Sequence, residues 1–205
     1  MKDAPVEVFT VGHSNHSLDD FIALLRSQGI SAVADVRSSP YSRYTPQFGR
    51  EALKSALNSV QIAYVFMGRE LGARSDDPGH YVEGRVSYRA LRESALFQQG
   101  VERVLGGAKK YRLTLMCAEK EPLECHRTLL VAPELIRQGV KVTHIRDGGS
   151  LESHEECMER LLLLTGMGSE QDDLFMSKEE LVEEAVERQS ERVAWVDESL
   201  ISGGA

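Results

Sequence analysis

Residues 6–36, VEVFTVGHSNHSLDDFIALLRSQGISAVADV, predict a strand, a helix and a second strand in succession. The β-branched and aromatic run at 6–11 is typical of a strand, as is the apolar run at 30–36. Between them, the Ser17 hydroxyl can cap a helix whose apolar face begins at Leu18, and Gly29 can end that helix. Because a βαβ unit of this length joins parallel strands, we expect a parallel sheet.

The same alternation continues along the chain to about residue 164. We expect further strands at 62–67, 111–116 and 140–145, and helices at 50–60, 88–105 with an interruption at Gly100, 127–138 and 154–164. Strands that alternate with helices indicate an α/β fold. The prediction is a mainly parallel sheet of about five strands with helices on both faces, followed by an acidic C-terminal helical extension.

The C-terminal part differs from the rest in charge. Residues 165–205 hold eleven Asp or Glu and three Lys or Arg, whereas acids and bases balance in residues 1–164. We therefore divide the chain into an α/β domain at 1–164 and an acidic linker with a helical tail at 165–205. The tail helix is expected at 178–194, beginning with a capping box at Ser177 and Glu180. We expect it to dock on the domain, on a protein partner or on a second copy.

Composition indicates the kind of cellular compartment that suits the protein. The sequence has three cysteines, no run of eighteen apolar residues and no signal-peptide pattern after Met1. Three cysteines are too few for a disulfide framework, so a reducing compartment is the better interpretation. We expect a cytoplasmic protein with no membrane contact and no cofactor.

Polar and titratable residues follow the predicted strands. In a parallel sheet the carboxyl ends of the strands share one edge, where ligands gather. Four segments are expected to deliver chemistry to that edge, namely Gly12-His13-Ser14, Asp35-Val-Arg37, Cys117-Ala-Glu119 and the run from His144 to Gly149. Their convergence is the main physical argument for a site.

Cys125 is the candidate nucleophile at this edge. It precedes a predicted helix, and the partial positive charge of a helix N-terminus lowers the pKa of a thiol. Glu119 or His13 would act as general base, and Arg37 or Arg127 would bind an anion. The alternative is that Cys125 is a small buried hydrophobe and Arg127 pairs with an acid.

Two other residues at this edge also have two interpretations. Asp35 is a candidate base, or forms an ion pair with Arg37; both can hold at once. Gly12 leaves room for a ligand to approach the backbone beside His13.

The spacing of the candidate ligands argues against a metal site. Cys117 and Cys125 are separated by seven residues, which misses the usual short spacing of zinc ligands, and His126 directly follows Cys125. Adjacent Cys and His side chains rarely bind one ion together. No metal ligand is therefore assigned.

Two long loops interleave arginine with aromatic residues, from Arg37 to Arg50 and from Arg69 to Arg89. This composition is typical of surfaces that bind nucleotides or single-stranded nucleic acid. The alternative is that the rings pack the loops and the arginines pair with nearby acids. We expect a small phosphate-bearing ligand or single-stranded nucleic acid as partner.

Several motifs together resemble a known family. They are Thr10-Val-Gly-His-Ser-Asn15, Asp35-Val-Arg37 followed by Pro40, Leu71-Gly72, and Cys117-Ala-Glu119 with Cys125-His-Arg127. From about residue 6 to 165 the chain resembles the domain of unknown function 488 family. The resemblance implies an α/β bacterial or archaeal protein and a site made of Gly12, His13, Ser14, Asp35, Arg37, Cys117, Glu119, Cys125, His126 and Arg127. It implies no activity.

The leading hypothesis is an enzyme that acts on a phosphate-bearing substrate, either a nucleotide or nucleic-acid-like. In it, Cys125, Glu119, His13 and Asp35 are catalytic, whereas Gly12, Ser14, Arg37, Cys117, His126 and Arg127 bind the substrate anion. The alternatives are a module that binds a nucleotide or anion without chemistry, and an interaction scaffold that uses the acidic tail.

Overall fold

The central element is a six-stranded sheet. The computed structural model describes residues 6–41, 43–167 and 176–201. Across the sheet, the strands lie in the order β3 (Ala63–Phe66), β2 (Ala32–Asp35), β6 (Leu113–Cys117), β1 (Glu7–Gly12), β7 (Lys141–Ile145) and β8 (Leu151–Ser153). All neighbours are parallel except β7 and β8, which are antiparallel. The mainly parallel α/β sheet is confirmed, with one short edge strand beyond the five that we expected.

β1 and β2 are parallel as predicted, but they are not neighbours. β6 lies between them and bonds to both, with Leu113 opposite Val8 of β1 and Ala32 of β2. The three middle strands are almost entirely buried, which explains their apolar composition without polar alternation. The carboxyl end of β6 therefore lies between the carboxyl ends of β1 and β2.

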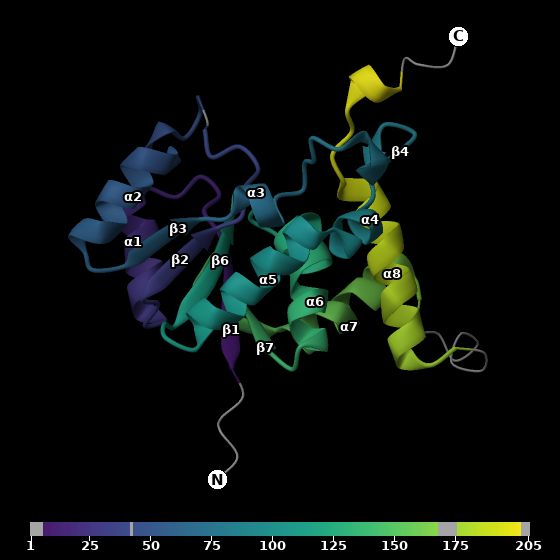
Figure 1. Cartoon of the computed structure of the whole chain (residues 1–205). Helices are drawn as coiled ribbons and strands as arrows, with labels where there is room; N and C mark the ends of the chain where they lie inside the picture. Colours follow the sequence, from purple (N-terminus) through teal and green to yellow (C-terminus); the bar gives the residue numbers. More distant parts are fainter. Residues whose placement is uncertain (1–5, 42, 168–175, 202–205) are drawn as a thin grey trace.

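Helices cover both faces of the sheet, as expected (Figure 1). α1 (Leu18–Ser27) and α2 (Arg50–Ser59) lie on one face, where Phe9, Phe21 and Leu53 share one apolar core. The opposite core contains buried side chains from α5 (Ala95–Ala108), α6 (Ala132–Arg137) and α7 (His154–Thr165). Full burial of one Leu or Phe side chain contributes about 1.5–3 kcal/mol, so each core stabilises the fold substantially.

Shorter elements lie in the two long loops and in other connections of the chain. They are α3 (Gly68–Leu71), α4 (Tyr88–Glu93), the hairpin of β4 (Tyr81–Val82) and β5 (Arg85–Val86), and 3-10 turns at Pro46–Phe48, Pro78–His80, Pro122–Glu124 and Glu198–Leu200.

The expected break at Gly100 was wrong. The chain breaks at Ser94 instead, because its hydroxyl accepts from the Phe97 amide and begins α5. Gly100 lies within α5, where a Cβ would stand 2.7 Å from Leu71.

The helix that we expected at 127–138 begins irregularly. Arg127–Val131 forms a π-helical turn, and the α-helical part, α6, follows it. Pro133 has no N–H to donate into this turn, which accounts for the loss of α-helical bonding there.

The C-terminal extension is helical and docks on the domain. α8 (Lys178–Val193) begins with the expected Ser177–Glu180 capping box and buries Leu181, Ala185 and Val186 against the core that contains α7. Beyond α8, the Val86 amide donates to the Trp195 carbonyl, so the chain also pairs with the β4–β5 hairpin. Residues 168–175, most of the expected linker, lie outside the described residues. None of the described helices has the length and apolar character needed to cross a membrane.

Candidate functional site

The predicted strand-end residues do meet at one edge of the sheet. Gly12 lies opposite Cys117 in the β1–β6 register, and the His13 amide donates to the Cys117 carbonyl at 2.9 Å. On the other side of β6, the Val36 amide donates to the Met116 carbonyl at 3.0 Å. β1, β2 and β6 thus bring His13, Arg37 and Cys117 to a common rim.

Position 12 must be glycine because the loop after β6 leaves no room for a side chain there. A Cβ at this position would stand 1.9 Å from the Glu119 carbonyl oxygen. We expected the glycine to leave space for a ligand, but the loop that follows β6 occupies that space. Gly12 therefore positions Glu119.

Asp35, Arg37 and His13 form a closed network. The Arg37 guanidinium donates from Nε to Asp35 Oδ1 at 2.9 Å and from NH2 to Asp35 Oδ2 at 2.6 Å. Asp35 Oδ2 also accepts from the Tyr64 hydroxyl at 2.8 Å, and Asp35 is fully buried. The ion-pair interpretation of Asp35 describes these contacts, which leave its carboxylate without a free oxygen for a substrate.

His13 is held as a neutral acceptor. Arg37 NH1 lies 3.1 Å from His13 Nε2, and because arginine can only donate, Nε2 must carry the lone pair. His13 Nδ1 then donates to the Ser14 carbonyl at 2.9 Å. Burial and the neighbouring Arg37 charge lower the His13 pKa to about 4. Its basic nitrogen is occupied, so His13 does not suit the role of general base.

Cys125 and Glu119 are directly hydrogen-bonded to each other. The Cys125 thiol donates to Glu119 Oε2 at 3.0 Å. Burial opposes ionisation of Cys125, but hydrogen bonding with Cys117 and the charges of Arg127 and His126 bring its pKa well below the usual value. Burial and the nearby Cys125 charge raise the Glu119 pKa. The two groups compete for a proton.

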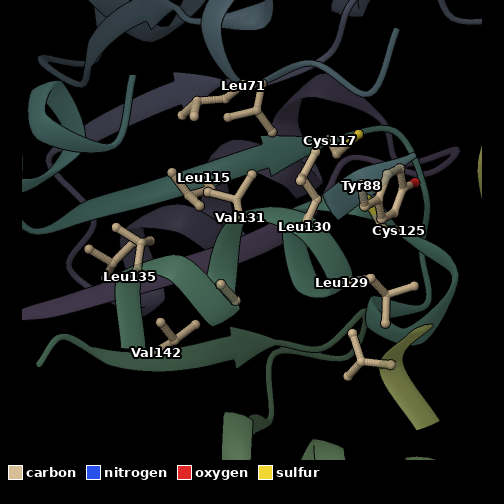
Figure 2. Close-up of a cluster of buried hydrophobic side chains, with 14 of the residues drawn as sticks. Leu71, Tyr88, Leu115, Cys117, Cys125, Leu129, Leu130, Val131, Leu135 and Val142 are labelled. Atoms are coloured by element: carbon tan, nitrogen blue, oxygen red, sulfur yellow. The ribbon is translucent and has the colours of Figure 1, made fainter. Parts of the chain in front are cut away.

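Cys117 and His126 complete this group. Cys117 Sγ lies 3.6 Å from His126 Nδ1, and Cys125 Sγ lies 3.9 Å from the same atom. Figure 2 shows both cysteines at the margin of the apolar core, with the Tyr88 ring beside Cys125. Burial, and then the Cys125 partner, raise the pKa of Cys117, so the two thiols differ in acidity.

A pocket of about 220 Å³ opens beside this group. Its lining includes Arg37, Cys117, Glu119 and His126 from the expected site, together with Arg74 and Trp195. Gly12, His13, Ser14, Asp35, Cys125 and Arg127 lie outside the lining. The expected residues therefore separate into a pocket wall and a buried layer that supports it.

A known protein family matches most of the α/β domain. Residues 17–132 match the family described as "Domain of unknown function DUF488". The chain belongs to this family. The match is shorter than the resemblance at 6–165, and it includes Asp35, Arg37, Cys117, Glu119 and Cys125-His126-Arg127. No curated protein and no solved structure matches the chain significantly.

Of the two arginines expected to bind an anion, Arg37 lines the pocket of the DUF488 domain and Arg127 does not. Arg127 is fully buried, and its guanidinium donates to the carbonyls of Glu119 at 2.8 Å and Lys120 at 3.4 Å. It therefore holds the loop after β6 and stabilises negative charge on Cys125. Its side chain does not reach a ligand in the pocket.

Arg74 and Trp195 are pocket residues of this DUF488 protein that were not part of the predicted site. Arg74 is exposed, and its guanidinium stacks over the Trp195 ring at 3.6 Å. Trp195 lies in the acidic tail, beyond the family match. The arginine-rich loop at 69–89 was the available signal for Arg74, whereas nothing local in the sequence links Trp195 to this edge of the sheet.

Proposed function

We propose that this DUF488 protein is an enzyme that acts on a small phosphate-bearing substrate, such as a nucleotide or the end of a nucleic-acid strand. The observation that carries the proposal is the Cys125–Glu119 pair, 3.0 Å apart, beside a pocket with Arg74 in its wall. A proton-accepting carboxylate and an exposed guanidinium on one pocket are the minimum for base catalysis on an anion.

Anion binding is supported by the Arg74–Trp195 stack. An arginine whose face lies on an aromatic ring keeps its N–H edge available for a phosphate oxygen. The pocket, at about 220 Å³, is smaller than the roughly 300–1,000 Å³ of sites that enclose a drug-sized ligand. It suits a phosphate group, with a base or sugar remaining outside near the half-exposed Trp195 ring.

Proton transfer is assigned to Glu119. Its raised pKa makes the carboxylate a better base near neutral pH than an ordinary glutamate. The group that it deprotonates is either the Cys125 thiol or a water molecule. Cys125 is 1% exposed and lies outside the pocket lining, so a substrate reaches the sulfur only if Glu119 moves aside.

The test combines binding and turnover. Inorganic phosphate and adenosine monophosphate should raise the melting temperature, and Arg74→Gln should weaken both affinities about tenfold because a charge-assisted hydrogen bond contributes roughly 1.5–3 kcal/mol. Arg26→Gln, on the exposed side of α1 across the sheet, should bind as the wild type does. Equal binding by the Arg74 and Arg26 variants would remove the proposal.

Turnover is followed by phosphorus NMR on a panel of phosphate esters. Glu119→Gln should lower the rate by about 10²–10⁴-fold, and Glu102→Gln, exposed on α5, should not. Cys125→Ser, compared with the wild type in chelator-treated protein, then separates the two nucleophiles, since without a metal only the thiol route requires sulfur. Phosphate binding without turnover of any ester would favour the non-catalytic binding module instead.

A further inference from the structure

Four side chains with metal-binding atoms gather beside the pocket. The sulfurs of Cys117 and Cys125, a carboxylate oxygen of Glu119 and a ring nitrogen of His126 all lie within 4.8 Å of one another. The cysteines and the histidine are buried, whereas Glu119 as a whole residue is exposed and turns its carboxylate inward onto Cys125. Two thiols, an imidazole and a carboxylate are a ligand set that suits zinc.

The sulfur–nitrogen distances agree with a tetrahedral ion. Bonds of about 2.3 Å to sulfur and about 2.0 Å to nitrogen place a sulfur and a nitrogen ligand about 3.5 Å apart around zinc. The two sulfur–nitrogen distances are 3.6 Å for Cys117 and 3.9 Å for Cys125, both to Nδ1 of His126. The sulfur–oxygen distance of 3.0 Å is shorter than such an ion requires, so the Glu119 carboxylate has to move outward when the metal binds.

The orientation of His126 is the second, independent observation. Its Nε2 lies 3.0 Å from the Val36 carbonyl oxygen, which can only accept, so Nε2 must carry a hydrogen. The nitrogen left to bind a metal is therefore Nδ1, the atom that faces both sulfurs. Histidine ligands of metals are held in this way, with the second ring nitrogen anchored on a carbonyl or carboxylate.

Charge also balances in the metal-bound form. A divalent ion with two thiolates and one carboxylate carries one negative charge in total. Arg127, fully buried and within hydrogen-bonding reach of the Glu119 carbonyl, supplies one positive charge. The complete cluster is then neutral, which limits the cost of burying it.

The seven-residue gap that disfavoured a metal is closed by the fold of the loop. A 3-10 turn at Pro122–Glu124 reverses the chain after β6. Glu121 is fixed by Arg146 at 3.0 Å and Arg160 at 2.7 Å, and the Leu123 carbonyl accepts from Gln189 of α8 at 2.7 Å. The loop thereby returns Cys125 and His126 to Cys117.

We propose that Cys117, Cys125 and His126 bind a zinc ion, with Glu119 as a fourth ligand that exchanges for a ligand in the pocket. Each thiol that still carries a proton releases it as the sulfur–metal bond forms. Three buried ligands and one displaceable position are the arrangement of catalytic rather than structural zinc. With zinc bound, both sulfurs are occupied, which leaves water as the nucleophile and the displaced Glu119 as its base.

Cobalt is the probe for this site, because tetrahedral cobalt–thiolate coordination absorbs strongly in the visible and near ultraviolet. The full chain, treated with chelator and kept reduced, is titrated with Co²⁺ in the absence of phosphate. We expect these bands to saturate at one equivalent and to disappear when Zn²⁺ is added. Absence of the bands, or weak absorption typical of octahedral cobalt, would overturn the proposal.

Matched variants assign the ligands. Cys117→Ser and Cys125→Ser should each weaken the sulfur charge-transfer bands and together abolish them, whereas Cys157→Ser, a buried cysteine on α7, should keep them. Retention of the bands in the double variant at 117 and 125 would refute the assignment.

If the serine variants fail to fold, Glu119→Gln tests whether this cluster binds the metal. It should weaken cobalt binding roughly tenfold or more and shift the visible bands, because an exposed ligand changes without loss of the core. Unchanged affinity and bands would remove Glu119 as a ligand.

The cobalt titration uses no substrate, and the phosphate titration is repeated with chelator present. Failure of either experiment therefore leaves the other informative.

Discussion

Gly12 illustrates how a single residue fixes the loop that carries the site. Its neighbour across the β1–β6 edge is the Glu119 carbonyl oxygen, only 1.9 Å from the position of a Cβ. Gly12→Ala must push that backbone away, so we expect a loss of about 3 kcal/mol in the free energy of unfolding. Urea denaturation measures this loss, and Co²⁺ affinity should fall with it because Glu119 and the loop to Cys125 move.

Gly106→Ala is the matched control for this residue. Gly106 lies in α5 with no heavy atom within 4 Å of an added Cβ. Alanine is the better helix former by about 1 kcal/mol, so this variant should be neutral or more stable. An equal effect of the two substitutions would contradict the close approach at Gly12.

At the level of elements, α8 packs against the core that contains α7 and contributes buried side chains to it. Leu181 is 2% exposed on α8, and we expect Leu181→Ala to cost about 2–5 kcal/mol of unfolding free energy. Leu163→Ala, at a position 82% exposed on α7, should change it by no more than about 0.5 kcal/mol. Equal midpoints in urea for both variants would show that α8 does not contribute to the cooperative core.

The elements also show where sequence patterns suffice. β-branched runs and capping residues located β1, α1 and α8 because these signals are local. β8 has three residues, too few to show any periodicity. The insertion of β6 between β1 and β2 depends on long-range pairing, which no local pattern encodes.

For the site, the sequence predicted which segments meet but not which atoms face the pocket. Convergence followed from the shared carboxyl edge of parallel strands, a property of topology. Arg127 is absent from the pocket wall, and Arg74 is present beside Arg37, because Arg127 turns its guanidinium inward to backbone carbonyls. The clustering of Cys117, Cys125 and His126 depends on a loop closed by contacts from α7 and α8, which lie distant in sequence.

At the scale of the whole molecule, buried neutral histidine makes global stability depend on pH. His13 is 3% exposed, and its pKa falls from 6.5 to about 4 in the folded state. Between these values the unfolded chain binds more protons, so this contribution is complete above pH 6.5 and is lost as pH falls towards 4. At pH 4.5 the loss is about 2 kcal/mol. His13→Gln, whose amide oxygen can still accept from Arg37, should remove that part of the pH dependence. Urea denaturation of both proteins at pH 7 and pH 4.5 measures it: the variant should lose about 2 kcal/mol less than the wild type, and equal losses would show that His13 is not held neutral by Arg37 and burial.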